Sequence, residues 1–332
     1  MNHTKPLLSK KMGISIVTLI GILFIAILFS HENQFADPEH ELIKKVIAAA
    51  IVVVGVVIFI VFYDKLVVLP AELWQNRKLI WKLAKNDFKT RYAGSYLGMV
   101  WALAQPVVTI LLYWFVFGTI MKSRQQVAGN IDVPYVLWLT AGLVPWFYFS
   151  EAISNGTNAL LEYNYLVKKV VFKISILPII KIIAATFIHV FFVCIMLVVY
   201  FCYGYQPSLY LLQLIYFSLC MFLFVLALSY ATCAIVVFFR DLNQIISIFL
   251  QIGMWATPIL WNINQLSPTM QVVFKLNPIF YIVNGYRSAM FEKTWFWQDF
   301  YSTMYFWIVL ILLFGFGALI FKRLKVHFAD VM

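Results

Sequence analysis

The sequence predicts an all-α polytopic membrane protein, and three observations lead to that prediction. Of the 332 residues, 63% are hydrophobic and 12% are charged, whereas soluble domains are about half apolar and about a quarter charged. The mean hydropathy is +0.88. Eight apolar runs are each close to the roughly 20 residues with which a helix crosses a bilayer, and they cover residues 13–30, 46–69, 96–121, 135–152, 179–203, 209–238, 243–261 and 301–321.

The first two runs form a hairpin that precedes the rest of the chain. Lysines before the first run resemble the start of a signal peptide, but no small-residue cleavage site follows Ser30, so we expect a span. A short linker around Pro70 separates the hairpin from the later runs. We therefore expect two domains, an additional transmembrane hairpin over residues 1–71 and a six-span domain over residues 72–332.

Residues 72–92 predict an amphipathic helix at the start of the second domain. At about 100° per residue, its apolar and aromatic side chains share one side, namely Leu73, Trp74, Ile80, Trp81, Ala84, Phe88 and Tyr92. A stripe of lysines runs beside them, formed by Lys78, Lys82, Lys85 and Lys89. An apolar face with a basic edge is typical of a helix that lies in a membrane interface. We expect the chain to enter the bilayer directly after this helix, in the run at 96–121.

The distribution of Lys and Arg predicts the orientation of the chain. Basic residues gather before the first run, in 72–92, in the 158–178 connection and after residue 321, so both termini are expected in the cytoplasm. Lys122 and Arg124 would lie outside and are a mild exception. Because the basic residues behind the net charge of +11 lie at the ends of apolar runs, they predict topology and no nucleic-acid partner.

Residues 267–292 are apolar but too interrupted for a clean span. Pro268, Asn277, Pro278 and Arg287 lie within them. We expect a re-entrant or interfacial helical hairpin on the outer face, which is tolerated only where protein covers it or where it lines water. An external loop on the lipid surface is the alternative.

Ionisable and metal-ligating residues are sparse within the apolar runs. The four cysteines have no metal-ligand spacing, so no metal site is expected. We expect Lys181 to snorkel to the inner surface and His189 to be a hydrogen-bonded structural residue. Proton-coupled carriers usually place acidic and basic pairs along their pathway, and the lack of such pairs in the sequence argues against that class.

Six segments follow one another in residues 72–332: DFKTRYAGSYLGMVWALAQP (87–106), YWFVFG (113–118), GLVPWFYFSEAISNGTNALLEYNYLVKKVVF (142–172), FFRD (238–241), TPILW (257–261) and LNPIFYIVNGYR (276–287). Together they resemble the permease subunit of ABC-2-type polysaccharide exporters, the family that includes teichoic-acid and O-antigen exporters. The resemblance implies a six-span exporter core with an amphipathic interface helix and an outer re-entrant hairpin. It gives no role for residues 1–71.

The same resemblance implies the partners and the cargo. Two copies of the chain would form a channel in the bacterial cytoplasmic membrane, each docked on a separate nucleotide-binding ATPase subunit that holds ATP and Mg. The cargo would be a polysaccharide carried on a polyprenyl-diphosphate lipid. The sequence contains no GxxxxGK[ST] phosphate loop, which an ATPase of this type needs. We therefore expect a transport subunit that is not itself an enzyme and holds no cofactor.

Two groups of residues are predicted to bind partners on the cytoplasmic side. In the 158–178 connection, the resemblance favours an ATPase-docking helix with Glu162, Tyr163, Tyr165, Lys168 and Lys169 as contacts, and an ordinary basic loop is the alternative. At the junction of the amphipathic helix with the next run, Arg91 and Tyr92 are predicted to meet the lipid head group, because arginine can bind phosphate in bidentate fashion. The alternative is that this helix only anchors the chain to lipid.

Aromatic residues are the candidates for the channel wall, because sugars stack on aromatic rings. Trp101, Tyr113, Trp255 and Trp261 are the predicted residues, and the two last flank the helix-breaking Thr257-Pro258. The alternative is a membrane-interface belt.

Two other functions compete with glycan export. A membrane-embedded glycan transferase or polymerase would need clustered carboxylates or histidines, and the sequence offers such a cluster only in DPEHE (37–41). An ABC exporter of small lipids or drugs is the second rival. The sequence does not identify the glycan.

Overall fold

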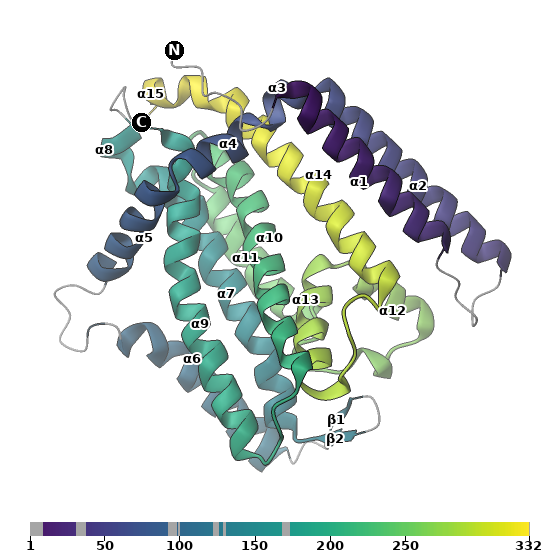
Figure 1. Ribbon diagram of the computed structural model, residues 1–332. Helices are drawn as coiled ribbons and strands as arrows, with labels where there is room; N and C mark the ends of the chain where they lie inside the picture. Colours follow the sequence, from purple (N-terminus) through teal and green to yellow (C-terminus); the bar gives the residue numbers. More distant parts are fainter. Residues whose placement is uncertain are drawn as a thin grey trace. The chain divides into compact units, whose positions relative to one another are not determined.

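The computed structural model describes residues 9–30, 38–91, 98, 100–121, 126–128, 131–167 and 173–331 (Figure 1). The chain divides into two compact units, unit 1 over residues 1–77 and unit 2 over residues 78–332. Each is described by itself.

Unit 1 is a helical hairpin followed by two short helices. Its elements are α1 (Lys10–Ser30), α2 (Pro38–Val61), α3 (Tyr63–Leu66) and α4 (Val68–Gln75). α1 packs against α2, and the contact is close at Gly21, where an added Cβ would lie 2.8 Å from Val56 Cγ2. Both α1 and residues 41–61 of α2 are long and apolar enough to cross a membrane. Two apolar helices were predicted here, but the second, predicted over 46–69, ends at Val61.

The predicted continuous helix over residues 72–92 is wrong, because the chain forms two helices there. α4 ends at Gln75 and α5 runs from Arg77 to Arg91. Between them, Asn76 leaves the helical conformation (φ −99°, ψ 12°), and its side-chain amide donates a hydrogen bond to the Glu72 carbonyl at 2.6 Å. An asparagine that bonds a nearby backbone carbonyl competes with helix continuation, which explains the interruption.

Unit 2 is a bundle built around four long helices. α7 packs against α9 and α10, and α10 packs against α14 (Figure 1). At Gly156 of α7, an added Cβ would collide with Ser229 of α10, so glycine is needed for this close approach. The elements are α6 (Val100–Tyr113), η1 (Trp114–Ile120), β1 (Gln126–Ala128), β2 (Ile131–Val133), α7 (Tyr135–Glu162), α8 (Asn164–Val167), η2 (Ile174–Ile176), α9 (Leu177–Cys202), η3 (Leu209–Leu212), α10 (Gln213–Val236), α11 (Leu242–Ala256), η4 (Ile263–Gln265), α12 (Pro268–Lys275), α13 (Pro278–Arg287), η5 (Ser288–Glu292), α14 (Phe300–Leu324), η6 (Lys325–His327) and α15 (Phe328–Val331).

The two ends of the bundle differ. One end, called the α8 end, carries the C-terminus of α7, α8 and the N-terminus of α9. The other, called the hairpin end, carries α12, α13 and the connection between α9 and α10, together with the short antiparallel ribbon of β1 and β2 (Figure 1). The ribbon pairs Gln126 with Val133 and was not expected in an all-α chain.

Among the described residues, six helices are long and apolar enough to cross a membrane, four of them in unit 2. The other two predicted spans contain shorter apolar helices, Val107–Ile120 and Leu242–Ala256. With 15 residues, α11 rises only about 22 Å, less than the roughly 30 Å of hydrocarbon. It stops because Pro258 restricts Thr257 to extended backbone, and Thr257 has φ −87° and ψ 130°. The prediction of eight full-length spans is corrected to six long helices and two short ones.

α13 enters the bundle, which confirms the re-entrant hairpin over the alternative of a loop on lipid. The Tyr286 hydroxyl lies 3.0 Å from His189 Nε2, near the middle of α9, and 2.6 Å from Ser218 Oγ of α10. α13 packs against α7, α10 and α14 and is buried over most of its length, whereas the preceding α12 has no buried residue. His189 is therefore a hydrogen-bonded structural residue, as expected.

Candidate functional site

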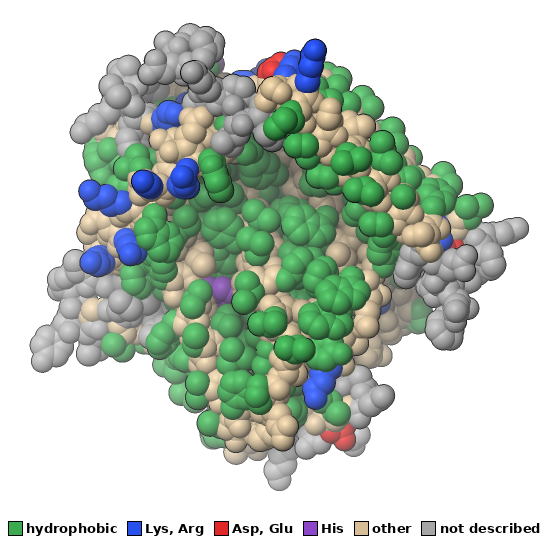
Figure 2. All heavy atoms as spheres, in the orientation of Figure 1, with side chains coloured by type: hydrophobic (Ala, Val, Ile, Leu, Met, Phe, Trp, Pro, Cys, Tyr) green, Lys and Arg blue, Asp and Glu red, His purple; other side chains and the backbone are tan. Residues whose placement is uncertain are grey.

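The amphipathic helix α5 packs on α9 with one face. Its buried residues are Ile80, Ala84 and Asp87, spaced by four and three residues and therefore on one side of the helix. Phe88 contacts Phe187 of α9 edge-on, with ring centroids 5.4 Å apart. The predicted lysine stripe is exposed throughout, and Figure 2 shows basic side chains gathered over α5.

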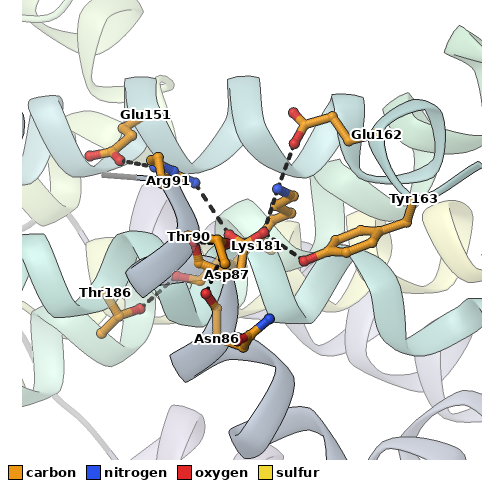
Figure 3. A network of polar contacts seen from close by, with 10 residues as sticks. Asn86, Asp87, Thr90, Arg91, Glu151, Glu162, Tyr163, Lys181 and Thr186 are labelled. Atoms are coloured by element: carbon orange, nitrogen blue, oxygen red, sulfur yellow. Dashed lines mark hydrogen bonds and ion pairs between the residues drawn. The ribbon is translucent and has the colours of Figure 1, made fainter. Parts of the chain in front are cut away.

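Asp87 is the centre of a group of charged side chains from three helices (Figure 3). Its Oδ1 accepts hydrogen bonds from Lys181 Nζ of α9 and from the Tyr163 hydroxyl, both at 2.6 Å. Lys181 Nζ also lies 2.5 Å from Glu162 Oε2 at the end of α7. We call the group the charged cluster, and it consists of Asp87, Arg91, Glu151, Glu162, Tyr163 and Lys181.

Arg91 extends the charged cluster along α7. Its Nη1 donates to Glu151 Oε1 at 2.7 Å, and its Nη2 lies 3.6 Å from Asp87 Oδ2. Arg91 therefore connects one turn of α5 to the middle of α7, while Asp87 connects it to α9 and to the end of α7. The three helices are joined by directional, charge-assisted contacts, which are stronger than neutral hydrogen bonds.

The pair at the centre of the charged cluster is shielded from solvent. Asp87 is 7% exposed and Lys181 is 5% exposed, so each ion depends on the other for stabilisation. Burial and the hydrogen bond to Asp87 raise the pKa of the Tyr163 phenol, which keeps the donor protonated. Lys181 was expected to snorkel to the surface. That expectation is wrong, because two carboxylates hold its ammonium group inside the protein.

The end of α7 is also joined to α10 and α11. Thr157 Oγ1 lies 2.8 Å from Thr232 Oγ1 of α10, and Asn243 of α11 donates its side-chain amide to Asn158 Oδ1 at 2.9 Å. The last two turns of α7, together with Tyr163 directly after them, thus contact four other helices through polar side chains.

The predicted docking residues divide into two groups. Glu162 and Tyr163 turn inward to the charged cluster, although the Glu162 side chain remains 49% exposed. Tyr165 of α8 points outward and is 61% exposed. Lys168 and Lys169 lie outside the described residues. Contact of this segment with an ATPase stays a prediction.

The predicted head-group residues are Arg91 and Tyr92. Arg91 is half-buried and its guanidinium is engaged by Glu151 and Asp87, so phosphate binding would have to share or replace these contacts. Tyr92 lies outside the described residues. Head-group contact stays a prediction.

Three of the four predicted channel aromatics lie on or next to exposed faces. Trp101 of α6 and Trp255 of α11 are exposed, and the Trp261 indole donates to the Trp255 carbonyl at 2.9 Å. Tyr113 is half-buried and meets Phe117 edge-on, with ring centroids 6.0 Å apart. A channel role for these residues stays a prediction.

α11 has a feature that the sequence reading missed, a polar stripe on a short apolar helix. Gln244, Ser247 and Gln251 are exposed and are spaced by three and four residues, so they share one side of the helix. Trp255, four residues after Gln251, lies on the same side of the helix one turn further along. Exposed amides are unfavourable against hydrocarbon, so this face is suited to water or to another protein surface.

The charged cluster was also missed, although the sequence holds a signal for it. Asp87 lies seven residues after Ile80 and three after Ala84, within the apolar side of the amphipathic helix. A carboxylate on a buried face requires a cationic or hydrogen-bonding partner. The partner itself, Lys181, is 94 residues away, and no local pattern connects the two.

The fold and the site together define a helical membrane protein in which an amphipathic helix is joined to the bundle by ion pairs, of which Asp87–Lys181 is buried. Comparison with known families agrees with this class. The chain belongs to the ABC-2 type transporter family, whose model matches residues 78–291, more than half of the chain. The match begins at the first residue of unit 2.

Two relatives match this chain over most of their own length, and a third matches over a short segment. The chain is 30% identical over 226 residues to the O-antigen export system permease protein RfbA of Myxococcus xanthus, covering 68% of this chain and 84% of that protein. It is 26% identical over 254 residues to the O-antigen export system permease protein RfbA of Klebsiella pneumoniae, covering 75% and 93%. A shorter match of 32% over 79 residues is to the polysialic acid transport protein KpsM of Escherichia coli, covering 24% and 28%.

Proposed function

We propose that this chain is the permease subunit of an ATP-driven exporter that moves a polysaccharide, attached to a polyprenyl-diphosphate lipid, across the bacterial cytoplasmic membrane. The observation that carries the proposal is the match to O-antigen export permeases over 84–93% of their length. The polysialic acid transport protein, matched over 24% of this chain, is a third relative that is named for a glycan.

The proposal includes a separate ATPase subunit docked at the α8 end. Family membership supports such a partner, and the sequence contains no GxxxxGK[ST] loop with which to bind nucleotide itself. Tyr165 and the exposed part of the Glu162 side chain would meet the ATPase, and Lys168 and Lys169, which lie outside the described residues, remain predicted contacts from the sequence. In this arrangement the α8 end and both termini face the cytoplasm, in agreement with the basic residues of α5.

The charged cluster would transmit the movement of the ATPase. When the docked subunit displaces α8, the end of α7 moves with it, and the ion pairs carry α5 and α9 along. The hydrogen bond between Asn158 and Asn243 passes the displacement to α11. Two-state elements that both sites bias are the physical requirement for such coupling. We propose that the charged cluster is that element, with the Asp87–Lys181 pair closed in one state and opened to solvent in the other.

The exposed polar stripe of α11 would line the export pathway, facing the same helix of a second copy of the chain. A polysaccharide needs a hydrated route through the bilayer, and Gln244, Ser247 and Gln251 supply hydrogen-bonding groups along one. Trp255 at the far end of the stripe adds an aromatic face. α5 and Arg91 would lie where the diphosphate head group enters.

Reconstitution tests the proposal. The chain and its ATPase would be placed together in proteoliposomes that contain a fluorescent lipid-linked glycan, and a glycan-binding lectin outside would report export. We expect lectin-accessible glycan to accumulate with ATP and Mg and not with a non-hydrolysable analogue. ATP-dependent movement of a lipid without any glycan, at the same rate, would favour an exporter of small lipids and overturn the proposal.

A further inference from the structure

A polar cavity of about 170 Å³ lies at the hairpin end of unit 2, away from the charged cluster and the α11 stripe. α7, η4, the end of α12, α13, η5 and the start of α14 contribute to its wall. A narrower cavity of about 40 Å³ adjoins it, and the two share a wall formed by Lys275, Phe280, Asn284, Asp299 and Ser302.

The wall of the larger cavity balances charge and mixes donors with acceptors. Lys275 and Arg287 are matched by Glu292 and Asp299, and amide groups from Asn262, Asn264 and Asn284 lie among them. Amides both donate and accept hydrogen bonds. Such a wall favours a neutral ligand with many hydroxyl groups over an anion or a cation.

Several of these polar groups are not used by the fold. In the part of the chain that the structure describes, the side chains of Lys275, Asn284, Asp299 and Ser302 make no hydrogen bond or ion pair with protein. Lys275 and Asp299 are exposed, and Asn284 and Ser302 are half-buried, so all four can exchange the water that solvates them for the hydroxyl groups of a ligand.

The floor of the cavity is held rigidly. Arg287 is buried and donates to the carbonyl oxygens of Pro258 at 2.7 Å and Ile259 at 2.9 Å. Its guanidinium also lies 3.4 Å from the centre of the Trp138 ring. These contacts fix α13 against the break that follows α11, so the cavity is formed before any ligand arrives, which lowers the cost of binding.

We propose that this cavity binds one neutral sugar unit of the exported chain at the hairpin end, an inference that rests on the proposed function. The cavity is smaller than the roughly 300–1,000 Å³ of sites for drug-sized ligands, which suits a single ring rather than an oligosaccharide. η4, which lines the cavity, begins seven residues after the end of α11.

Saturation-transfer NMR tests binding without any transport. The purified full-length chain in nanodiscs is mixed with the methyl glycosides of glucose, galactose, mannose and N-acetylglucosamine. We expect transfer to at least one glycoside and about tenfold weaker binding in Asn284→Leu, as the loss of one or two hydrogen bonds would give. Asp299→Asn, which keeps the side-chain volume, should weaken binding as well. Gln265→Leu is the control, since Gln265 is exposed at the same end and outside the cavity.

The outcomes separate the two proposals. No transfer to any glycoside, or equal transfer in wild type and both cavity variants, overturns the sugar site. If the wild-type complex exports glycan normally in that case, the proposed function stands. If glycosides bind and the complex moves no glycan, the function is overturned and the cavity remains a sugar site of another role.

Discussion

The substitution of Lys181 by Met tests the charged cluster most directly. Methionine keeps the length of the side chain and removes its charge. Asp87, 7% exposed, then retains the Tyr163 hydroxyl at 2.6 Å and Arg91 at 3.6 Å. Breaking a buried ion pair from one side costs about 3–5 kcal/mol. Because Arg91 stays nearby and Glu162 can turn to water, we expect the lower end, about 3 kcal/mol.

A double-mutant cycle separates the ion pair from packing. In Asp87→Asn/Lys181→Met both charges are gone, and replacing a buried pair by uncharged groups of similar volume is often nearly neutral. We expect the double variant to lose only about 1 kcal/mol. The coupling free energy would then be at least about 2 kcal/mol, well above the additivity error of about 0.3–0.5 kcal/mol.

The assay is chemical unfolding of the purified full-length chain in detergent micelles, followed by tryptophan fluorescence. Lys82→Met serves as the control, because Lys82 is exposed on the same helix face as the other stripe lysines and such changes usually stay within about 0.5 kcal/mol. The reasoning fails if Lys181→Met is no more destabilising than the control. It also fails if the double variant is as unstable as the sum of the two single variants.

Three further predictions concern function. The purified chain without its partner should release no phosphate from ATP, because it lacks a phosphate loop. Measurable ATP hydrolysis by the chain alone would contradict the proposal that a separate subunit is the ATPase. Charge reversal at Lys168 and Lys169 should abolish co-purification with the ATPase while the size-exclusion profile of the permease stays normal, and normal co-purification would remove these residues from the interface. Arg91→Ala should lower the stimulation of ATPase activity by lipid-linked substrate. Glu151→Gln distinguishes two ways in which Arg91 could act. If the Arg91 guanidinium binds the head group, Glu151→Gln keeps the stimulation that Arg91→Ala loses. If Arg91 acts through its ion pair with Glu151, both variants lose it. Unchanged stimulation in Arg91→Ala would exclude Arg91 from substrate entry.

The sequence allowed much of the fold to be predicted, because hydrocarbon imposes a strict rule on it. Every spanning segment must satisfy its own backbone hydrogen bonds, so long apolar runs become helices. The hairpin at 267–292 was predictable from the prolines that interrupt it. The predicted ends of the helices were less accurate. α11 ends at Ala256 and α4 ends at Gln75, since Pro258 and Asn76 each stop a helix within an apolar or amphipathic pattern.

The candidate site was predictable only in part. The amphipathic pattern identified α5 and its exposed lysines, and Arg91 was singled out for its charge and position. Its partner Glu151, 60 residues away, could not be found from the pattern of either segment. The pairing of Asp87 with Lys181 could not be found from sequence patterns either. Side chains of two helices pair only if each helix is packed with the right side turned toward the other, and no local pattern specifies that.

By itself, the sequence determined that this chain is a helical membrane protein, where its basic segments lie, and which family it resembles. These properties follow from the composition and from the order of segments along the chain. Long apolar segments form helices in a membrane because burial of apolar side chains and pairing of backbone hydrogen-bonding groups both favour them. Only the tertiary structure decided that Lys181 is buried between two carboxylates, that α13 reaches His189, and that polar groups converge on a cavity at the hairpin end. Those features depend on distances between helices far apart in sequence, which burial and charge pairing determine only once the bundle has packed.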